Sequence, residues 1–201
     1  MRKYISTVEH YDNLIDENND PVYDSKPLQE YMNKWDGSSF FNELMLTNNS
    51  EVLEIGVGTG RLALKVLKYG CKNFTGIDLS QKTIDKAKIN LQGFINYSLI
   101  VGDYLKVPFG KTFDVIYSSL TFFHIENKVF AIEKSWSLLN EKGRFVLSID
   151  KTNCEFLNYE NYRIKMFADE LNQTINLLKE CGFNIENVIE TEFANIISAT
   201  K

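Results

Sequence analysis

Cysteine, proline and histidine are scarce in this chain of 201 residues, with three, three and two copies. The cysteines Cys71, Cys154 and Cys181 are widely separated, so they form neither a metal-ligand spacing nor a disulfide framework and predict reduced thiols. No run approaches the roughly 20 apolar residues that cross a bilayer, and the charged start lacks the apolar stretch of a signal peptide. We therefore expect a cytoplasmic protein without a membrane partner.

An excess of positive charge is also lacking. The chain has 22 Lys and Arg against 27 Asp and Glu, a net charge of −5, so we expect no broad basic face and no nucleic-acid partner. Its length suits one domain, since a chain of this size buries roughly 70% of its unfolded surface. We predict a single domain over residues 1–201, with a helical N-terminal cap over 1–50 and a core over 51–201, as a monomer or homodimer.

Strand-like and helix-like segments alternate after residue 50, which indicates a parallel sheet built through right-handed crossovers. The last two strand-like segments have only three residues between them, too few for a crossover, so they predict an antiparallel hairpin. The fold class is therefore α/β, a Rossmann-like doubly wound sheet, mostly parallel with one antiparallel strand from the C-terminal hairpin. The seven predicted strands are 52–55, 74–79, 97–101, 113–118, 144–149, 185–190 and 194–200.

A glycine-rich turn follows the first of these strands. Gly56, Gly58 and Gly60 alternate with other residues, and without Cβ atoms they let the backbone take positive φ and lie against a ligand. Glu54 precedes the turn at the carboxyl end of the strand, where open α/β sheets hold their ligands. The pattern predicts a site for a nucleotide-like ligand.

Two cofactors compete for this turn. A dinucleotide site has the spacing G-x-G-x-x-G, but Arg61 stands where its third glycine belongs. Asp78 follows the second strand and suits a ribose diol in either case. Glu54 would repel a pyrophosphate and attract an ammonium group, and the C-terminal hairpin is foreign to a doubly wound dinucleotide fold. An NAD(P)-dependent oxidoreductase is therefore the less favoured alternative.

The motifs at the strand ends resemble the class I S-adenosylmethionine-dependent methyltransferases. They are Leu53-Glu-Ile-Gly-Val-Gly-Thr-Gly60, Gly76-Ile-Asp-Leu-Ser80, Val101-Gly-Asp-Tyr104, Phe113-Asp-Val-Ile-Tyr-Ser-Ser119 and Leu138-Leu-Asn-Glu-Lys-Gly-Arg-Phe-Val-Leu147. The resemblance covers roughly residues 45–200 and implies an enzyme that binds S-adenosyl-L-methionine and methylates an acceptor.

The resemblance also implies roles for single residues. The glycine turn would lie under the methionine part of the cofactor, Asp78 would accept hydrogen bonds from both ribose hydroxyls, and Asp103 would accept one from the adenine amino group. Simpler roles stay open, such as helix capping for Glu54 and a surface turn for Asp103. The cofactor-binding residues implied are Glu54, Gly56, Val57, Gly58, Gly60, Asp78, Leu79, Asp103, Tyr104, Ser118 and Ser119.

Chemistry at the methyl group points to the loop after the fourth strand. Displacement at a sulfonium needs positioning rather than a metal, so we expect no metal site. His124 is a candidate general base, and a histidine that merely opens the next helix is the alternative. Aromatic side chains of the loop and cap are candidates for the wall of the substrate pocket, or else for the core: Tyr11, Trp35, Phe122 and Phe123.

Sequence motifs that are missing from the same loop limit the classes of acceptor molecule. Ser118-Ser-Leu-Thr121 replaces the Asn/Asp-Pro-Pro-Tyr motif with which relatives methylate amino groups of bases or glutamine. No cysteine for attack on a pyrimidine and no carboxylate cluster for magnesium lies there. We therefore predict a small-molecule acceptor, methylated by direct in-line displacement. The alternative to an enzyme is a protein of the same fold that binds the cofactor without catalysing a reaction.

Overall fold

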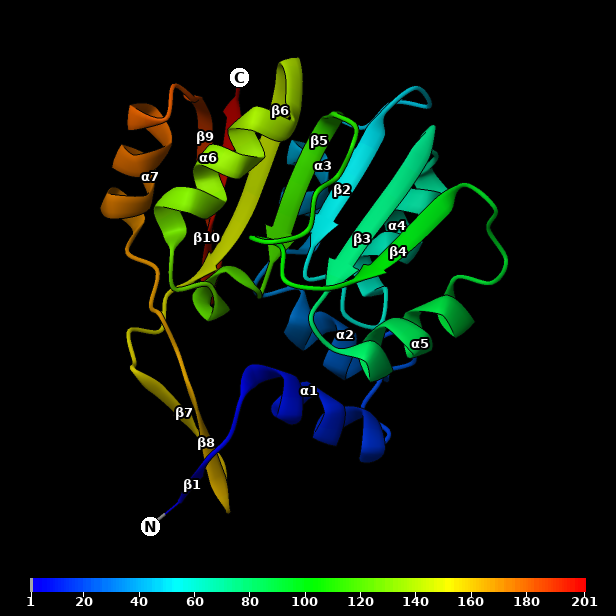
Figure 1. The fold of residues 1–201 in the computed structure, drawn as a ribbon, viewed down its shortest axis with the longest axis vertical. Helices are drawn as coiled ribbons and strands as arrows, with labels where there is room; N and C mark the ends of the chain where they lie inside the picture. The colour runs from blue at the N-terminus through cyan, green and yellow to red at the C-terminus, as the bar shows by residue number, and fades with distance from the viewer. Residues whose placement is uncertain (1) are drawn as a thin grey trace.

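The computed structural model describes residues 2–201, and its main sheet has seven strands in the order β4-β3-β2-β5-β6-β10-β9 (Figure 1). The first five strands of this order are parallel, and β10 alone runs against its neighbours β6 and β9. The predicted α/β sheet with one reversed strand is confirmed. Its strands are β2 (Glu51–Ile55), β3 (Asn73–Asp78), β4 (Tyr97–Val101), β5 (Phe113–Ser119), β6 (Leu139–Asp150), β9 (Asn184–Glu190) and β10 (Ala194–Thr200).

Helices cover both faces of the sheet because alternate strand residues point to opposite sides. Leu53 of β2 joins a buried cluster with α6 (Lys128–Leu138) and α7 (Leu171–Glu180), whereas the adjacent Val52 joins a second cluster with α3 (Gly37–Glu43) and α4 (Arg61–Tyr69). In Figure 1, α6 and α7 accordingly lie in front of the sheet, with α3 and α4 behind it. The helices after the cap are α4 (Arg61–Tyr69), α5 (Gln81–Asn90), α6 (Lys128–Leu138) and α7 (Leu171–Glu180), with the short 3-10 helix η1 (Phe122–His124) before α6.

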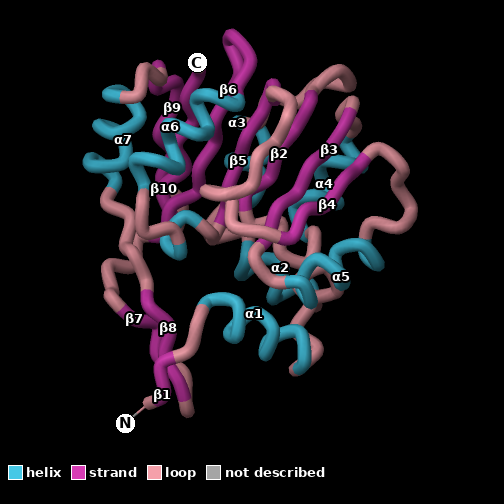
Figure 2. Tube along the Cα trace, viewed as in Figure 1, coloured by secondary structure: helices cyan, strands magenta, loops and turns pink. Residues whose placement is uncertain are grey.

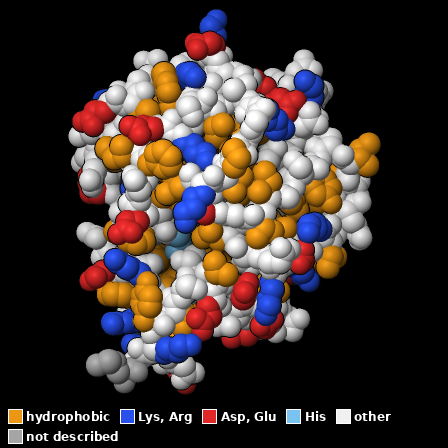
Figure 3. All heavy atoms as spheres, viewed as in Figure 1, with side chains coloured by type: hydrophobic (Ala, Val, Ile, Leu, Met, Phe, Trp, Pro, Cys, Tyr) orange, Lys and Arg blue, Asp and Glu red, His pale blue; other side chains and the backbone are white. Residues whose placement is uncertain are grey.

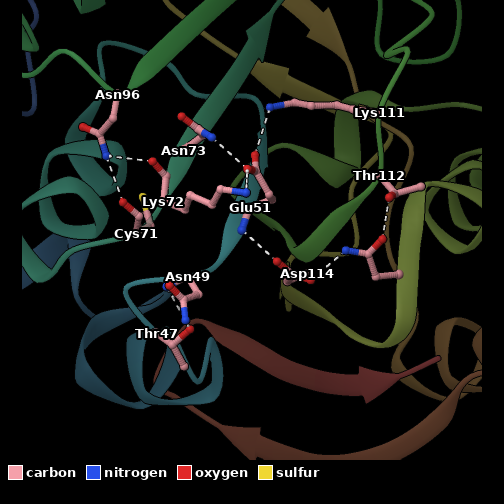
Figure 4. Close-up of polar contacts among 11 residues, drawn as sticks. Thr47, Asn49, Glu51, Cys71, Lys72, Asn73, Asn96, Lys111, Thr112 and Asp114 are labelled. Carbon is pink, nitrogen blue, oxygen red and sulfur yellow. Dashed lines mark hydrogen bonds and ion pairs between the residues drawn. The ribbon is translucent and has the colours of Figure 1, made fainter.

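A polar network closes the amino-terminal ends of the strands (Figure 4). The Glu51 carboxylate accepts hydrogen bonds from Asn73 Nδ2 at 2.7 Å and Lys111 Nζ at 3.3 Å, and the Glu51 backbone N–H donates to Asp114 Oδ2 at 2.8 Å. Burial raises the pKa of Glu51, but these donors and Lys72 outweigh it and hold the pKa below its usual value. The Glu51 carboxylate at this end of the sheet is thus paired with side chains of the protein itself. A ligand site is therefore expected at the other end, where the strands have their carboxyl ends.

The cap crosses those carboxyl ends. It contains α1 (Thr7–Asp16), α2 (Lys26–Met32) and α3 (Gly37–Glu43), and α1 lies below the strand tips in Figure 1. Ser80 Oγ donates to Asp12 Oδ1 at 2.6 Å, and Lys82 Nζ lies 2.6 Å from Asp16 Oδ2, so α1 is fastened to the start of α5. The spacing of Leu28, Tyr31, Met32 and Trp35 and the cluster Phe40, Phe41 and Leu44 predict helices near α2 and α3, whereas α1 was not predicted.

A small three-stranded sheet extends beside α1, at the lower left of Figure 2. Its strands are β1 (Lys3–Tyr4), β8 (Tyr162–Lys165) and β7 (Phe156–Asn158), and β1 pairs with β8 in parallel. Ile5 follows β1 and packs with Ile164 in a third buried cluster, separate from the two clusters of the main sheet. The sequence did not predict this sheet, which ties the start of the chain to the segment between β6 and α7.

The surface is mixed in charge. Basic and acidic side chains are interspersed on the face shown in Figure 3. No helix within residues 2–201 is long and apolar enough to cross a bilayer.

Candidate functional site

The glycine turn follows β2 and is fixed to the neighbouring strand. The N–H groups of Gly56 and Val57 both donate to Ile77 O, at 2.9 and 3.0 Å. Gly56, Gly58 and Gly60 all have positive φ, of 77°, 56° and 94°. A Cβ on Gly56 would lie 2.0 Å from Thr121 Oγ1, whereas a Cβ on Gly58 would meet nothing within 4 Å. Gly56 therefore permits close packing, and Gly58 borders open space.

That space is a cavity of about 940 Å³ between the strand ends, α1 and the loop after β5. Its size lies near the upper end of the range for ligand sites, roughly 300–1,000 Å³. The cavity brings together side chains and backbone from both halves of the chain. The sequence-predicted residues that line it are Tyr11, Glu54, Gly56, Val57, Gly58, Asp78, Leu79, Asp103, Tyr104, Ser119 and His124.

Asp78 ends β3 and presents its carboxylate to this cavity. Gly58 N–H donates to Asp78 Oδ2 and Ser80 N–H donates to Asp78 Oδ1, each at 3.0 Å. Burial raises the pKa of Asp78, and the backbone donors oppose this rise only in part. A carboxylate has roughly four acceptor positions, so Asp78 keeps acceptor capacity for a ligand that brings hydroxyl donors.

Glu54 is a buried acid beside the glycine turn. Its carboxyl is 3% exposed and accepts a hydrogen bond of 2.8 Å from the Tyr117 hydroxyl. Burial raises the pKa of Glu54 to about 8, although Tyr117 and the charge of Arg61 oppose the rise. The raised pKa favours the protonated side chain near neutral pH, and a cation placed beside it would favour the ionised form.

The cap contributes a buried ion pair to the same end of the sheet. Both guanidinium NH groups of Arg61 donate to Asp36, which begins α3, and the Asp36 side chain is fully buried. Ser119 Oγ and Gly37 N–H also donate to Asp36, at 2.9 and 2.6 Å. Burial alone would raise the pKa of Asp36, but Arg61 and these donors lower it. The pair holds the cap, α4 and the end of β5 together.

Tyr11 of α1 meets His124 of η1 across the cavity. The Tyr11 hydroxyl lies 2.9 Å from His124 Nε2, and within the described residues His124 Nδ1 has no hydrogen-bond partner. Burial, aided by the charges of His10 and Lys128, lowers the pKa of His124 to about 3. Burial and the charge of Asp78 raise the pKa of Tyr11. Both groups are therefore neutral over the physiological pH range.

Five predicted site residues lie elsewhere. Ser118 Oγ donates to Ile55 O at 3.0 Å inside the sheet, and Gly60 caps α4 against Leu91. Three aromatic side chains expected in the pocket wall do not line the cavity: half-buried Trp35 donates to Asp150 and packs on Phe193, buried Phe122 packs on Phe145, and buried Phe123 packs with Ile164.

Two further predicted residues line the cavity only in part. The Tyr104 hydroxyl points away into the core, 2.8 Å from Ser135 Oγ. Asp103 accepts a hydrogen bond from Leu105 N–H at 2.9 Å and pairs with Lys106 at 3.2 Å. Asp103 therefore stabilises a surface turn, which is the simpler of the two roles considered from the sequence. It also borders the cavity.

Several lining residues were not predicted. Thr59 belongs to the glycine turn, and within the described residues its buried hydroxyl has no hydrogen-bond partner. Thr121 packs on Gly56, and Phe167 comes from the segment before α7. Thr59 could have been inferred from its place in the turn, but nothing in the sequence marks Phe167. Within residues 2–201, no group of three or more His, Cys, Asp or Glu could hold a metal ion.

Comparison with known proteins gives a consistent result. The family model described as "Methyltransferase domain" matches residues 52–143. An uncharacterized methyltransferase of Staphylococcus carnosus is 33% identical over 155 residues, which cover 75% of this chain and 72% of that protein. A Methanocaldococcus jannaschii protein, provisionally named a protein N5-glutamine methyltransferase, is 31% identical over 163 residues, 75% of this chain and 79% of the relative.

Other relatives are longer, and solved structures share the fold. An uncharacterized methyltransferase of Bacillus cytotoxicus is 34% identical over 146 residues, so the match covers 71% of this chain but only 61% of the relative. The N-methyltransferase NodS from Bradyrhizobium japonicum, in complex with S-adenosyl-L-homocysteine, superposes with a TM-score of 0.75 at 17% identity, covering 97% of this chain and 98% of that chain. Magnesium protoporphyrin IX methyltransferase from Synechocystis gives a TM-score of 0.72 at 15% identity, covering 96% and 98%.

Proposed function

The chain belongs to the class I S-adenosylmethionine-dependent methyltransferase family, and from this premise we propose that it transfers a methyl group from S-adenosylmethionine to a small-molecule acceptor. The observation that carries the proposal is the joining of the glycine turn and Asp78 in one cavity. Gly58 borders open space and Asp78 keeps acceptor positions for a diol. These are the features that an adenosyl amino acid requires.

The residues present fit the cofactor. Asp78 would accept from the ribose hydroxyls and Glu54 would face the ammonium group. The Thr59 hydroxyl, which has no hydrogen-bond partner among the described residues, would bind the polar end of the methionine part. Leu79, which is 42% exposed, would flank the adenine. When bound, S-adenosylmethionine supplies an electrophilic methyl group on a sulfonium.

The chain's own contribution to the chemical step is positioning and proton removal. Holding a nucleophile at attack distance lowers a barrier by roughly 7–11 kcal/mol, and α1 closes the cavity over the strand ends to do so. We assign Tyr11 and His124 to the acceptor. His124 is neutral and can accept a proton, and Tyr11 fixes the orientation of its ring.

A small acceptor suits this chain better than a protein. The Methanocaldococcus relative is named for a protein glutamine acceptor, but this chain has Ser118-Ser-Leu-Thr121 where glutamine methylation uses Asn/Asp-Pro-Pro-Tyr. The α1 helix is also fastened over the cavity through Asp12 and Asp16. The space under it suits a small molecule.

A thermal-shift experiment tests the cofactor. S-adenosylhomocysteine at 100 times its dissociation constant should stabilise the protein by about 2.7 kcal/mol, because it binds only the folded state. NAD at the same concentration should leave the melting temperature unchanged. Stabilisation by NAD alone would support an oxidoreductase. Binding of S-adenosylhomocysteine without methyl transfer to any member of a metabolite panel would instead favour a non-catalytic protein.

Affinity for S-adenosylhomocysteine should rise with pH between about 6 and 8. Burial raises the pKa of Glu54 to about 8, so below this pH the carboxyl must lose a proton when it meets the ammonium group. Linkage then increases the affinity by up to about tenfold per pH unit and releases a proton on binding. Calorimetry in buffers of different ionisation enthalpy measures that proton. Glu54→Gln should flatten the profile, and an equally steep profile in this variant would refute the assignment.

His124→Gln should lower kcat by less than the roughly 10²–10⁴-fold that a general base matched to the working pH contributes, because burial makes His124 a weak base. Because burial lowers the pKa of His124 to about 3, the wild-type rate should show no limb near pH 6.5. Turnover and its pH profile are to be measured with the first acceptor identified. His10→Gln is the comparison variant, and it should change kcat less, since His10 lies outside the cavity lining, hydrogen-bonds Tyr162 at 3.0 Å and acts on His124 only through its charge. Full turnover of His124→Gln at every pH would remove the general base from the mechanism.

A further inference from the structure

One side of the cavity is formed by α1, the loop after β5 and the segment before α7, and each of them places apolar side chains in the lining. Leu14 and Ile15 of α1, Leu120 and Ile125 of the loop after β5, and Phe167 all contribute to it. None of these residues belongs to the strand-end motifs that suit the cofactor. A ligand in contact with them loses its hydration without gaining polar partners.

Among the described lining residues, the polar side chains on this side include no cation: Thr7, Tyr11, Thr121, His124 and Asn127 are uncharged, and Glu126 is an acid. Tyr11 and His124 are hydrogen-bonded to each other at 2.9 Å, and both are neutral. Together they offer one hydrogen-bond donor and one acceptor to a third group. Such a pair suits a hydroxyl or a neutral amino group and cannot neutralise a carboxylate or a phosphate.

Charge along the whole cavity lining disfavours anions further. The acids that line it are Glu54, Asp78, Asp103 and Glu126, and among the described lining residues Arg61 is the one cation. Both guanidinium NH groups of Arg61 already donate to Asp36, which is itself fully buried. An anionic acceptor would therefore be desolvated beside carboxylates with no free cation, an arrangement that proteins avoid.

The ion pair of Lys128 with Asp169, beside η1, does not change this balance. Lys128 lies 2.6 Å from Asp169 Oδ1, and the Lys128 ammonium also donates to Phe122 O. The Asp169 side chain is 1% exposed, so this pair is closed within the protein. It supports the backbone beside His124 and does not line the cavity.

We propose that the acceptor is a mainly apolar small molecule without negative charge, whose hydroxyl or amino group is presented to Tyr11 and His124. The inference rests on the proposed function, because it assigns the strand-end side of the cavity to the cofactor. It excludes phosphorylated and carboxylated metabolites as acceptors.

Binding of matched probes tests the inference without turnover. One- and two-ring phenols and arylamines, each paired with its ring carboxylate, are titrated into protein saturated with S-adenosylhomocysteine and followed by calorimetry and ligand-observed NMR. The uncharged member of a pair should bind on the order of 100-fold more tightly, since a buried unpaired charge is costly. Equal or tighter binding of the carboxylates, or no binding by any uncharged probe, would overturn the inference. Failure of S-adenosylhomocysteine itself to bind would instead overturn the proposed function and the inference with it.

Two variants test whether the lack of a free cation in the cavity causes the preference for uncharged probes over carboxylates. Leu14→Lys places an ammonium group in the cavity wall, and it should shift the preference toward the carboxylate probes at least tenfold. Leu28→Lys is the matched control, because Leu28 is 52% exposed on α2 and lies outside this cavity. The preference should stay unchanged there. An unchanged preference in Leu14→Lys would contradict the electrostatic reason given for the selectivity.

Discussion

Asp78→Ala should weaken the binding of S-adenosylhomocysteine at least 100-fold. The carboxylate has acceptor positions left after its bonds from Gly58 and Ser80. Two charge-assisted hydrogen bonds to the ribose would together contribute about 3–6 kcal/mol. The variant also frees the Gly58 N–H, which loosens the turn under the amino-acid part. Titration calorimetry measures the dissociation constant directly.

The control for this prediction is a carboxylate on the next helix. Asp85 lies on α5, is exposed, and bonds only to Gln81 and Lys88. Asp85→Ala should change the dissociation constant less than twofold, and circular dichroism should show that both variants are folded. A folded Asp78→Ala protein that binds within threefold of the wild type would show that Asp78 does not hold the ligand.

Asp36→Ala should destabilise the protein by about 3–5 kcal/mol, the cost of leaving a buried charge without its partner. Arg61 is only 15% exposed and donates twice to Asp36, so its guanidinium would lose its counter-ion in a site that water hardly reaches. Ser119 and Gly37 would lose their acceptor as well. Urea denaturation followed by tryptophan fluorescence measures the change in the free energy of unfolding.

Two further variants distinguish the buried Asp36–Arg61 pair from an exposed ion pair. The double variant Asp36→Ala, Arg61→Met removes the unpaired guanidinium and should recover part of the lost stability. Asp16→Ala breaks the exposed pair with Lys82 and should cost less than about 1 kcal/mol. A loss below about 1 kcal/mol for Asp36→Ala would mean that the pair does not fasten the cap to the core.

The main sheet could be predicted because each of its strands carries its own local signal. Val52–Ile55 and Phe113–Ser118 are short and apolar, and the segment from residue 191 to 193 is too short for a crossover. The small sheet had no such signal. Lys3–Tyr4 becomes a strand only because β8 lies beside it in space. Helix α1 was not predicted because its stretch of sequence is rich in polar residues. Two of them, Asp12 and Asp16, make polar contacts with the start of α5 that the sequence does not show.

The candidate site was predictable where topology alone decides position. Parallel strands bring their carboxyl ends to one edge, so Glu54, Asp78 and Ser119 meet there whatever the loops do. Aromatic residues carry no such information. Phe122 and Phe123 have the same chemistry in a core as in a pocket wall, and packing with β6 and β8 decided their place. The partner of Arg61 is 25 residues away in the chain, beyond any local pattern.

Titration of the unmodified protein with S-adenosylhomocysteine tests the central claim most directly, because it asks only whether the cavity over the glycine turn and Asp78 binds that molecule. Calorimetry should give a saturable isotherm with one site per chain, abolished by prior saturation with S-adenosylmethionine and unaffected by NAD. Absence of binding, or full competition by NAD, would contradict the account.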